Sequence, residues 1–274
     1  MPESTVHAPV RSVSGASVLG PRHARAGRVN EDALGWSPFD RSLEPLRTVA
    51  AVSDGHGSPM CSRSERGAAI AVQAGLTAGQ TLLRGAGGTG SADPRELIAL
   101  ASHLWRDAVD RDLAAHPLSP EQVELVEQAG PHTDLRLAYG CTLLLCAVTG
   151  TSVLLAQIGD GGIATLTDDG RGWFPLGPNP EHGRGASDSL CLPGAEDRAR
   201  TATLDAGLPH LLMLMTDGCT NAYPSTEDLL MIGADTVRLE AETGLRRANL
   251  TLESWLATTA DATEDDATLV SVWM

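Results

Sequence analysis

Short acidic motifs stand beside apolar runs at several points in this chain. Asp54-Gly55, Asp160-Gly161 and Asp217-Gly218 follow the runs at residues 49–52, 153–156 and 211–215. Two further motifs are Asn30-Glu31-Asp32-Ala33 and Asp265-Asp266-Ala267-Thr268, and the last precedes the run at 269–272. A carboxylate at the end of a buried strand is held rigidly beside water, which suits a hard divalent cation that takes oxygen ligands. Several such motifs in one chain predict that these strand ends share a function.

The composition predicts one α/β domain with an aliphatic core. The 274 residues suffice for one large domain, and 42% of them are hydrophobic while only 3% are aromatic. All 20 basic residues are Arg. The absence of Lys excludes Schiff-base catalysis by lysine and a Walker-type phosphate loop. The net charge of −15 argues against nucleic acid and against an anionic membrane as partners, because both attract basic surfaces.

The cysteines and the N-terminal segment predict a cytoplasmic protein. The five cysteines are odd in number, scattered, and without a Cys-x-x-Cys pair, which is typical of reduced, mostly buried thiols. The N-terminal segment lacks an apolar core of signal-peptide length. No apolar run approaches the roughly 20 residues that a membrane helix needs. We therefore expect no membrane partner.

Hydrophobic periodicity predicts an α+β fold. Helical spacing indicates helices over residues 62–83, 93–115, 120–128, 225–232 and 235–258. Short β-type runs indicate strands over 16–20, 33–36, 47–53, 141–148, 152–158, 163–167, the run before 217, and 267–273. Long helices grouped between runs of strands favour helices packed outside two antiparallel sheets. Residues 1–14 are predicted to be a disordered tail, and the Gly- and Pro-rich residues 177–200 a long loop.

Taken in order, the motifs resemble those of the metal-dependent (PPM, type 2C) serine/threonine protein phosphatases. The resemblance is closest to the bacterial branch, which opens with a Gly-x-x-His stretch, here Gly20-Pro21-Arg22-His23. It implies a four-layer α/β/β/α sandwich of two antiparallel sheets flanked by helices, formed as a single domain by residues 15–274. It also implies that the loop at about 177–200 is a flap that neighbours the active site.

The resemblance implies a pair of Mn²⁺ or Mg²⁺ ions as cofactors. Asp54 would bridge both ions, the backbone carbonyl of Gly55 would ligate one, and Asp217 and Asp265 would hold the other. Such a pair neutralises phosphate oxygens and lowers the pKa of a bridging water, so that hydroxide is available near neutral pH.

The resemblance also implies residues that bind metal less directly or at a third site. Asp32 and Glu31 would act through metal-bound waters, and Asp160 would help Asp217 to form a third metal site. Many family members carry an Asp four residues after the Asp of the Asp217-Gly218 motif, where this chain has Asn221. A neutral ligand there predicts that a third ion binds weakly.

The resemblance also assigns residues to the substrate. His56 matches the histidine that acts as general acid toward the leaving alkoxide, a role that suits a pKa near 6.5. Many members bind the substrate phosphate with an Arg five residues before the first Asp, but this chain has Gly27 there. Arg28, Arg25 and His23 remain as candidates for that contact.

Each motif taken alone also has a structural interpretation. Asp54-Gly55 could be a plain turn and Asp32 a helix or strand cap. Asp160 and His56 could be polar residues at strand ends, and Asp265 could belong to a solvated acidic run. The ordered set of motifs favours the metal site.

The function implied is metal-dependent hydrolysis of phosphoserine and phosphothreonine in proteins by a hydroxide that bridges the two ions, with a cognate Ser/Thr kinase as a further partner. One alternative is a regulatory phosphatase that acts on an anti-anti-sigma-like phosphoprotein. Another is a non-catalytic phosphatase-fold module that binds phosphoproteins or a kinase, which the missing Arg and Asn221 favour. The retained aspartates argue against it, because clustered like charges repel unless a cation lies between them.

Overall fold

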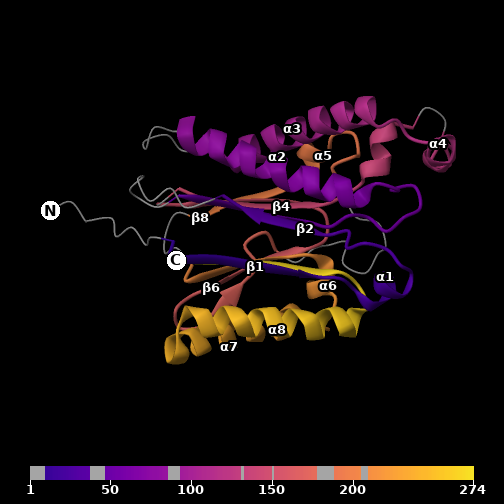
Figure 1. Cartoon of the computed structure of the whole chain (residues 1–274). Coiled ribbons are helices and arrows are strands. Elements are labelled where there is room, and N and C mark those ends of the chain that lie inside the picture. The colour runs from indigo at the N-terminus through magenta and orange to yellow at the C-terminus, as the bar shows by residue number, and fades with distance from the viewer. Residues whose placement is uncertain are drawn as a thin grey trace.

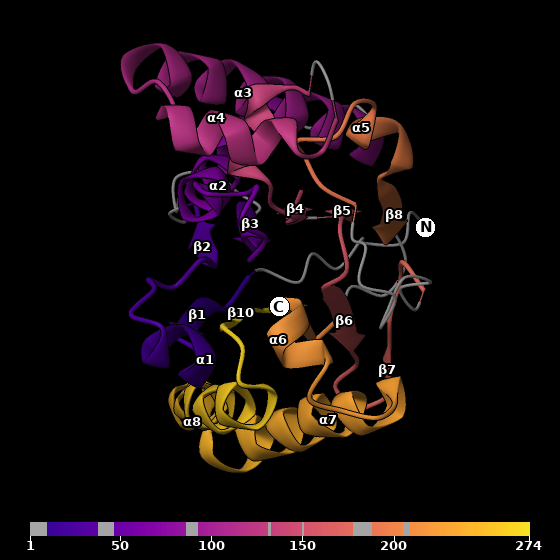
Figure 2. The ribbon, with the colours of Figure 1, turned by 90° about the vertical axis from the view of Figure 1, so that its right-hand side faces the viewer.

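Two antiparallel sheets lie face to face between two layers of helices (Figures 1 and 2). The computed structural model describes residues 10–37, 47–85, 93–130, 133–149, 151–177, 188–204 and 209–274. Within these residues, each sheet has five strands, in the orders β1-β10-β9-β6-β7 and β2-β3-β4-β5-β8. The predicted α/β/β/α sandwich is confirmed.

The first sheet is covered by α7 (Thr226–Thr243) and α8 (Leu245–Thr263), and the second by α2 (Ser64–Gly85) and α3 (Pro94–Ala115). The strands of the first sheet are β1 (Ser12–Val18), β10 (Ala267–Trp273), β9 (Leu211–Met215), β6 (Gly162–Leu166) and β7 (Gly172–Trp173). Those of the second are β2 (Ala33–Trp36), β3 (Thr48–Ser53), β4 (Leu143–Val148), β5 (Val153–Ile158) and β8 (Arg200–Leu204). The shorter helices are α1 (Pro21–Arg25), α4 (Pro120–Glu127), the 3₁₀ turn η1 (Leu135–Tyr139), α5 (Ala195–Arg198) and α6 (Asp217–Thr220).

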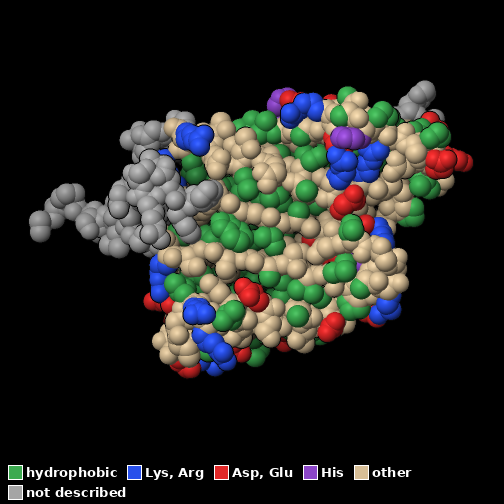
Figure 3. Space-filling model, viewed as in Figure 1, with side chains coloured by type: hydrophobic (Ala, Val, Ile, Leu, Met, Phe, Trp, Pro, Cys, Tyr) green, Lys and Arg blue, Asp and Glu red, His purple; other side chains and the backbone are tan. Residues whose placement is uncertain are grey.

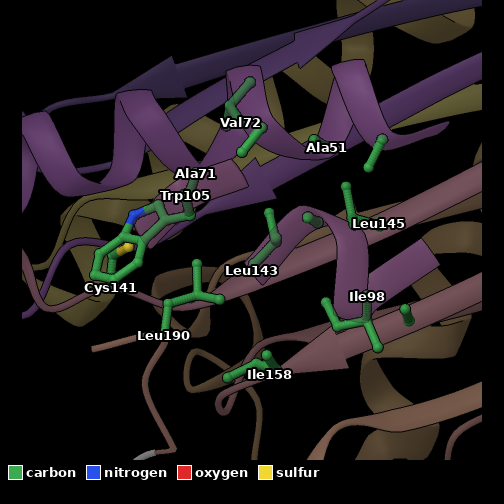
Figure 4. Close-up of a cluster of buried hydrophobic side chains, with 14 of the residues drawn as sticks. Ala51, Ala71, Val72, Ile98, Trp105, Cys141, Leu143, Leu145, Ile158 and Leu190 are labelled. Carbon is green, nitrogen blue, oxygen red and sulfur yellow. The ribbon is translucent and has the colours of Figure 1, made fainter. Parts of the chain in front are cut away.

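The central strands are buried on both faces, and their side chains alternate between two cores. In β4, Leu143 and Leu145 pack toward α2 and α3, whereas Leu144 and Cys146 pack between the sheets. Figure 4 shows part of the first of these cores, around Trp105. In β9 the same alternation separates the core under α7 and α8 from the core between the sheets. This explains why these strands read as continuous apolar runs, since both faces are covered.

Strand register brings the acidic motifs to one end of the sandwich. In the second sheet, Ala33 pairs with Ser53 and Leu143 pairs with Ile158, so the residues just before β2 and just after β3 and β5 lie together. In the first sheet, Met215 pairs with Gly162 and with Leu269. The residues before β6, after β9 and before β10 therefore meet at the corresponding end, which faces the viewer in Figure 2.

Several predictions about local structure are wrong in detail. The disordered tail was expected to reach residue 14, but β1 begins at Ser12 and pairs with β10 along its whole length. Residues 1–9 lie outside the described residues. A helix break was expected near residues 232–235. The break instead lies at Gly244, whose φ of +87° ends α7 and begins α8.

The stretch at 177–200 is more structured than a long loop. Residues 178–187 lie outside the described residues, but α5 occupies Ala195–Arg198 and β8 begins at Arg200. Arg106 of α3 pairs with Glu196 of α5 through two N–O contacts of 2.9 and 3.0 Å, which fixes this segment to the helical layer. The edge strand β8 has mostly polar, half-buried side chains and gave no β-type apolar signal.

Charge is distributed over the helical layers. On the face drawn in Figure 3, most acidic and basic side chains lie over the outer helices, and uncharged atoms fill the strip between them. None of the described helices is long and apolar enough to span a membrane.

Trp105 provides a test of the core that supports the site. Its side chain is fully buried, and its indole N–H donates a hydrogen bond of 3.0 Å to the backbone oxygen of Gly67 in α2. Trp105→Ala is expected to lower the free energy of unfolding by about 3–5 kcal/mol, measured by urea denaturation, because it leaves a cavity. Trp173→Ala is the control: this side chain is 38% exposed, and the expected loss is under about 1 kcal/mol. Equal losses in the two variants would contradict this assignment.

Candidate active site

A cleft of about 550 Å³ opens where the acidic motifs meet. It is lined by the backbone or side chains of Arg22, His23, Asp54, Gly55, His56, Gly57, Ser58, Met60, Cys61, Asp160, Asp217, Asp265 and Asp266. These residues come from the connections after β1, β3, β5 and β9 and before β10. The structure therefore brings together Asp54, Asp160, Asp217 and Asp265, which are far apart in the sequence.

Asp54 is fixed by the start of the neighbouring strand. Its backbone N–H donates to Oγ1 of Thr142 at 2.9 Å, and its backbone oxygen accepts from the Thr142 N–H at 2.8 Å. The next residue, Gly55, donates its N–H to the backbone oxygen of Glu31 at 3.1 Å. These bonds place the Asp54 carboxylate between the two sheets and tie it to the Glu31 segment.

Asp32 and Asp217 each accept a hydrogen bond from a neighbouring neutral side chain. Oγ1 of Thr216 donates to Oδ2 of Asp32 at 2.9 Å, and itself accepts from the Thr268 N–H at 2.9 Å. Nδ2 of Asn221 donates to Oδ2 of Asp217 at 3.0 Å. Asn221 is thus a hydrogen-bond donor to the Asp217 carboxylate in this structure.

The glycines of two Asp-Gly pairs are required by close approach of backbones. A Cβ on Gly55 would lie 2.6 Å from the backbone oxygen of Glu31, and one on Gly218 would lie 1.9 Å from that of Asp266. Neither glycine has a positive φ. The interpretation of these pairs as turn formers is therefore incomplete, because the glycines let two chain segments touch beside each carboxylate.

Burial and mutual repulsion raise the pKa values of the central carboxyls. Burial is the main cause for Asp54, whose pKa lies well above its usual value, and the charges of Asp217 and Asp32 add to it. Burial likewise raises the pKa of Asp32 to about 8 and that of Asp217 above its usual value. Burial and neighbouring negative charges thus disfavour the ionised forms of these carboxyls, and a cation between them would offset that cost.

Asp265 and Asp266 bind the segment that follows β1. Nη2 of Arg22 lies 2.9 Å from Oδ1 of Asp265. The buried Asp266 accepts hydrogen bonds from the backbone N–H of Gly20 and of Glu31, both at 2.7 Å, and lies 2.9 Å from Nδ1 of His23. Asp266 was not predicted to be a site residue, but these contacts make it the carboxylate that positions the Glu31–Asp32 segment.

The three candidates for phosphate binding lie in different surroundings. His23 is buried, lines the cleft and contacts Asp266. Arg28 pairs with Oε1 of Glu31, and its Nη1 lies 3.5 Å from the backbone oxygen of Gly57. Arg25 pairs with Glu264 at 2.9 Å and both side chains are largely exposed. Sequence reasoning missed Arg22, which lines the cleft and stands in the Gly20-Pro21-Arg22-His23 stretch.

His56 follows Gly55 at the floor of the cleft. Its backbone N–H donates to the oxygen of Gly140 at 3.0 Å, and burial lowers its pKa, while the charge of Asp160 acts in the opposite direction. Burial therefore disfavours the charged imidazolium form of His56.

One buried oxygen points to a cation. Oε2 of Glu31 is buried and has no hydrogen-bond partner among the described residues, although Nε2 of His23 lies 3.9 Å away. Burial raises the pKa of Glu31. Among the described residues, however, no three His, Cys, Asp or Glu side chains are arranged so that they could hold a metal ion. Asp32, Asp217 and Asp265 are turned instead toward Thr216, Asn221 and Arg22.

Solved structures of bacterial phosphatases share this fold. The serine/threonine phosphatase Stp1 from Staphylococcus aureus is 13% identical, with a TM-score of 0.57, over 99% of this chain and 98% of that one. PppA from Pseudomonas aeruginosa, described as a key regulatory component of T6SS, is 18% identical, with a TM-score of 0.56, over 96% and 98%. The catalytic domain of PstP in complex with 2 manganese ions is 15% identical, with a TM-score of 0.56, over 96% and 97%.

The search of curated proteins gave no match. A family model described as protein phosphatase 2C matches residues 19–257. This stretch includes Asp32, Asp54, Asp160 and Asp217, whereas Asp265 lies beyond it. Because the match covers most of the chain, the protein belongs to the protein phosphatase 2C family.

Proposed function

We propose that this protein hydrolyses phosphoserine and phosphothreonine in other proteins, with two Mn²⁺ or Mg²⁺ ions as cofactors. The observation that carries the proposal is the convergence of strand-end carboxylates on one cleft in a chain of this family. A structural relative described in complex with 2 manganese ions supports this choice of metal. The raised pKa values support it too, because a bound cation would stabilise the ionised carboxylates that burial disfavours.

The proposed ligands are those that the family resemblance implies, and the position of Asp54, Gly55, Asp217 and Asp265 around one cleft supports them. Asp54 and the Gly55 carbonyl would hold one ion, and Asp54, Asp217 and Asp265 the other. When bound, such ions supply positive charge to the phosphate and lower the pKa of a water. To bind them, Asp32, Asp217 and Asp265 would turn away from their present partners Thr216, Asn221 and Arg22. Asp32, Glu31 and Asp160 are proposed as outer ligands.

The proposed roles of the remaining residues concern the substrate. His56 would donate a proton to the leaving alkoxide. Its pKa is lowered by burial, so this role needs a nearby negative charge, such as the bound phosphate itself, to raise the pKa again. Once Asp265 binds a cation, Arg22 would be released to contact phosphate oxygens, and we add it to Arg28, Arg25 and His23 as a candidate for that contact.

The first test is hydrolysis of an aryl phosphate by the purified protein. Activity is expected with Mn²⁺ or Mg²⁺ and not with excess chelator. Asp54→Asn is expected to lower kcat/KM by roughly a hundredfold or more, because it removes the central ligand charge. Asp168→Asn, in the exposed turn after β6, is the control and should retain activity. Activity that survives chelation, or that survives Asp54→Asn, would refute the proposal. Inactivity toward both aryl phosphate and phosphopeptides would favour the non-catalytic module.

The dependence of the free energy of unfolding on pH tests the raised pKa of Asp32. The carboxyl of Asp32 keeps its proton up to about pH 8 in the folded protein, but loses it near 3.8 when unfolded. The folded state then binds more protons, so the metal-free protein should lose stability as the pH rises from about 4 to about 8. Mn²⁺ replaces those protons, so its stabilising effect should be larger at pH 8 than at pH 5.5. Urea denaturation in chelator and in excess Mn²⁺ measures both effects.

Asp32→Asn should weaken this pH dependence, since the neutral amide has no proton to lose. An unchanged dependence in that variant would show that other groups cause it. Absence of any Mn²⁺ effect on stability would contradict the metal site.

Kinetics can decide which arginine side chain binds the substrate phosphate. Arg22→Ala is expected to raise KM for the aryl phosphate roughly tenfold, since hydrogen bonds to charged groups contribute about 1.5–3 kcal/mol. Arg246→Ala, on the exposed face of α8, is the control. A larger increase in KM for Arg25→Ala or Arg28→Ala than for Arg22→Ala would assign the contact to that residue instead.

A further inference from the structure

We propose that a small apolar pocket beside the candidate active site receives an apolar side chain of the phosphoprotein substrate, close in sequence to the phosphorylated residue. This inference rests on the proposed function and names a preference of the same site. The pocket would make the enzyme select substrates by sequence as well as by phosphate.

The pocket has the size and lining of an apolar subsite. Its volume is about 160 Å³, and its walls include Phe174, Tyr223, Pro224 and Leu229. A cavity of about 150 Å³ lined by apolar residues accommodates a benzene molecule. This one therefore suits a single aromatic ring or a branched aliphatic side chain.

The pocket and the cleft share a wall. Asp160 lines both of them. The short helix α6 begins at Asp217, which lines the cleft, and ends at Thr220, which lines the pocket. Only Asp160 therefore separates the two cavities on one side. Along α6 they are less than two helical turns apart. An extended peptide advances about 3.3 Å per residue, so a phosphate in the cleft leaves its near neighbours within reach of the pocket.

The pocket is built before any ligand arrives. The ring of Tyr223 stacks on Trp255 of α8 at 6.2 Å between centroids, and its hydroxyl accepts a hydrogen bond of 2.5 Å from the Trp255 indole N–H. Leu229 is buried in α7, and Phe174 packs against the same core. A preformed pocket costs little conformational entropy when a side chain enters it.

The chemistry of the rim excludes acidic side chains. Among the residues that line the pocket, Asp160 carries the only charge, and the others are apolar, glycine or hydroxyl-bearing. A carboxylate would lose hydration there without a basic partner among the lining residues, whereas Phe174, Tyr223 and Leu229 would gain from contact with an apolar group. The expected order of preference is therefore Phe or Leu over Ala, and Ala over Asp.

The test is a set of phosphoserine peptides in which one position from −4 to +4 carries Phe, Leu, Ala, Lys or Asp. At one position, kcat/KM for the Phe or Leu peptide should exceed that for the Ala peptide roughly tenfold, as full burial of such a side chain implies. The Asp peptide should be slower than the Ala peptide at that position.

Two variants and one control connect that preference to the pocket. Thr226→Trp places a ring at the pocket wall and is expected to reduce the Phe-to-Ala ratio to about twofold or less. Glu227→Trp is the matched control, because Glu227 is exposed, is the next residue along α7 and does not line the pocket. Phe174→Ala enlarges the pocket and should shift the preference toward Trp.

The outcomes separate the two proposals. Aryl phosphate hydrolysis without any preference for Phe or Leu would overturn the pocket and leave the proposed function standing. A preference for Lys would assign selectivity to Asp160 and overturn the apolar subsite. A preference that Thr226→Trp and Phe174→Ala leave unchanged would also overturn it. Inactivity toward every phosphate ester in the presence of Mn²⁺ would overturn both proposals.

Discussion

Repulsion between carboxylates at one end of the sandwich is the constraint on which the rest of the structure depends. Burial raises the pKa values of three half-buried aspartates, Asp32, Asp54 and Asp217, and the negative charges of neighbouring aspartates raise them further. Because such groups disfavour one another's ionised forms, only a rigid backbone frame can hold them close together. The frame here is the pair of sheets, whose central strands are buried on both faces and whose apolar side chains fill three contiguous cores. The packing of the apolar strands thus provides the rigidity that keeps the carboxylates in place at the strand ends.

The cleft resolves the repulsion with the protein's own donors. Thr216 and Asn221 donate hydrogen bonds to Asp32 and Asp217, and Arg22 pairs with Asp265. These partners are neutral hydroxyl and amide groups or a largely exposed guanidinium, so each bond is weak enough to exchange for a bond to a cation. The backbone at these positions is held separately, by the hydrogen bonds of Thr142 and Asp266.

Much of this could be predicted from the sequence, because the signals were of two local kinds. Apolar runs of strand length followed by acidic residues located β3, β5 and β9 and the carboxylates after them. Helical spacing located α2 and α3. Elements that owe their structure to partners rather than to their own pattern were missed, such as β8, which adds to the edge of a sheet, and α1, which packs against the segment before β10.

Contacts between distant segments were not predictable from one sequence. Arg22 and Asp266 both stand in motifs that the sequence singles out, but their partners could not be predicted, since these contacts span more than 240 residues of sequence. Glycine was interpreted through its freedom in turns, whereas at Gly55 and Gly218 it matters for its lack of a side chain. Both failures have one cause. A local sequence pattern carries information about neighbouring residues of the chain, but not about the distant segments that pack against them.

The pairing of β1 with β10 makes the cleft depend on contacts between distant parts of the chain. These strands pair from Ser12–Trp273 to Val18–Ala267, and Asp265 and Asp266 contact Arg22, His23 and the Glu31 backbone. Because almost all of the described residues lie between the two strands, closing this loop costs conformational entropy that contacts within one element do not. Formation of the cleft is therefore tied to folding of the whole sandwich, and a fragment without either strand would lose the contacts that position the Glu31–Asp32 segment.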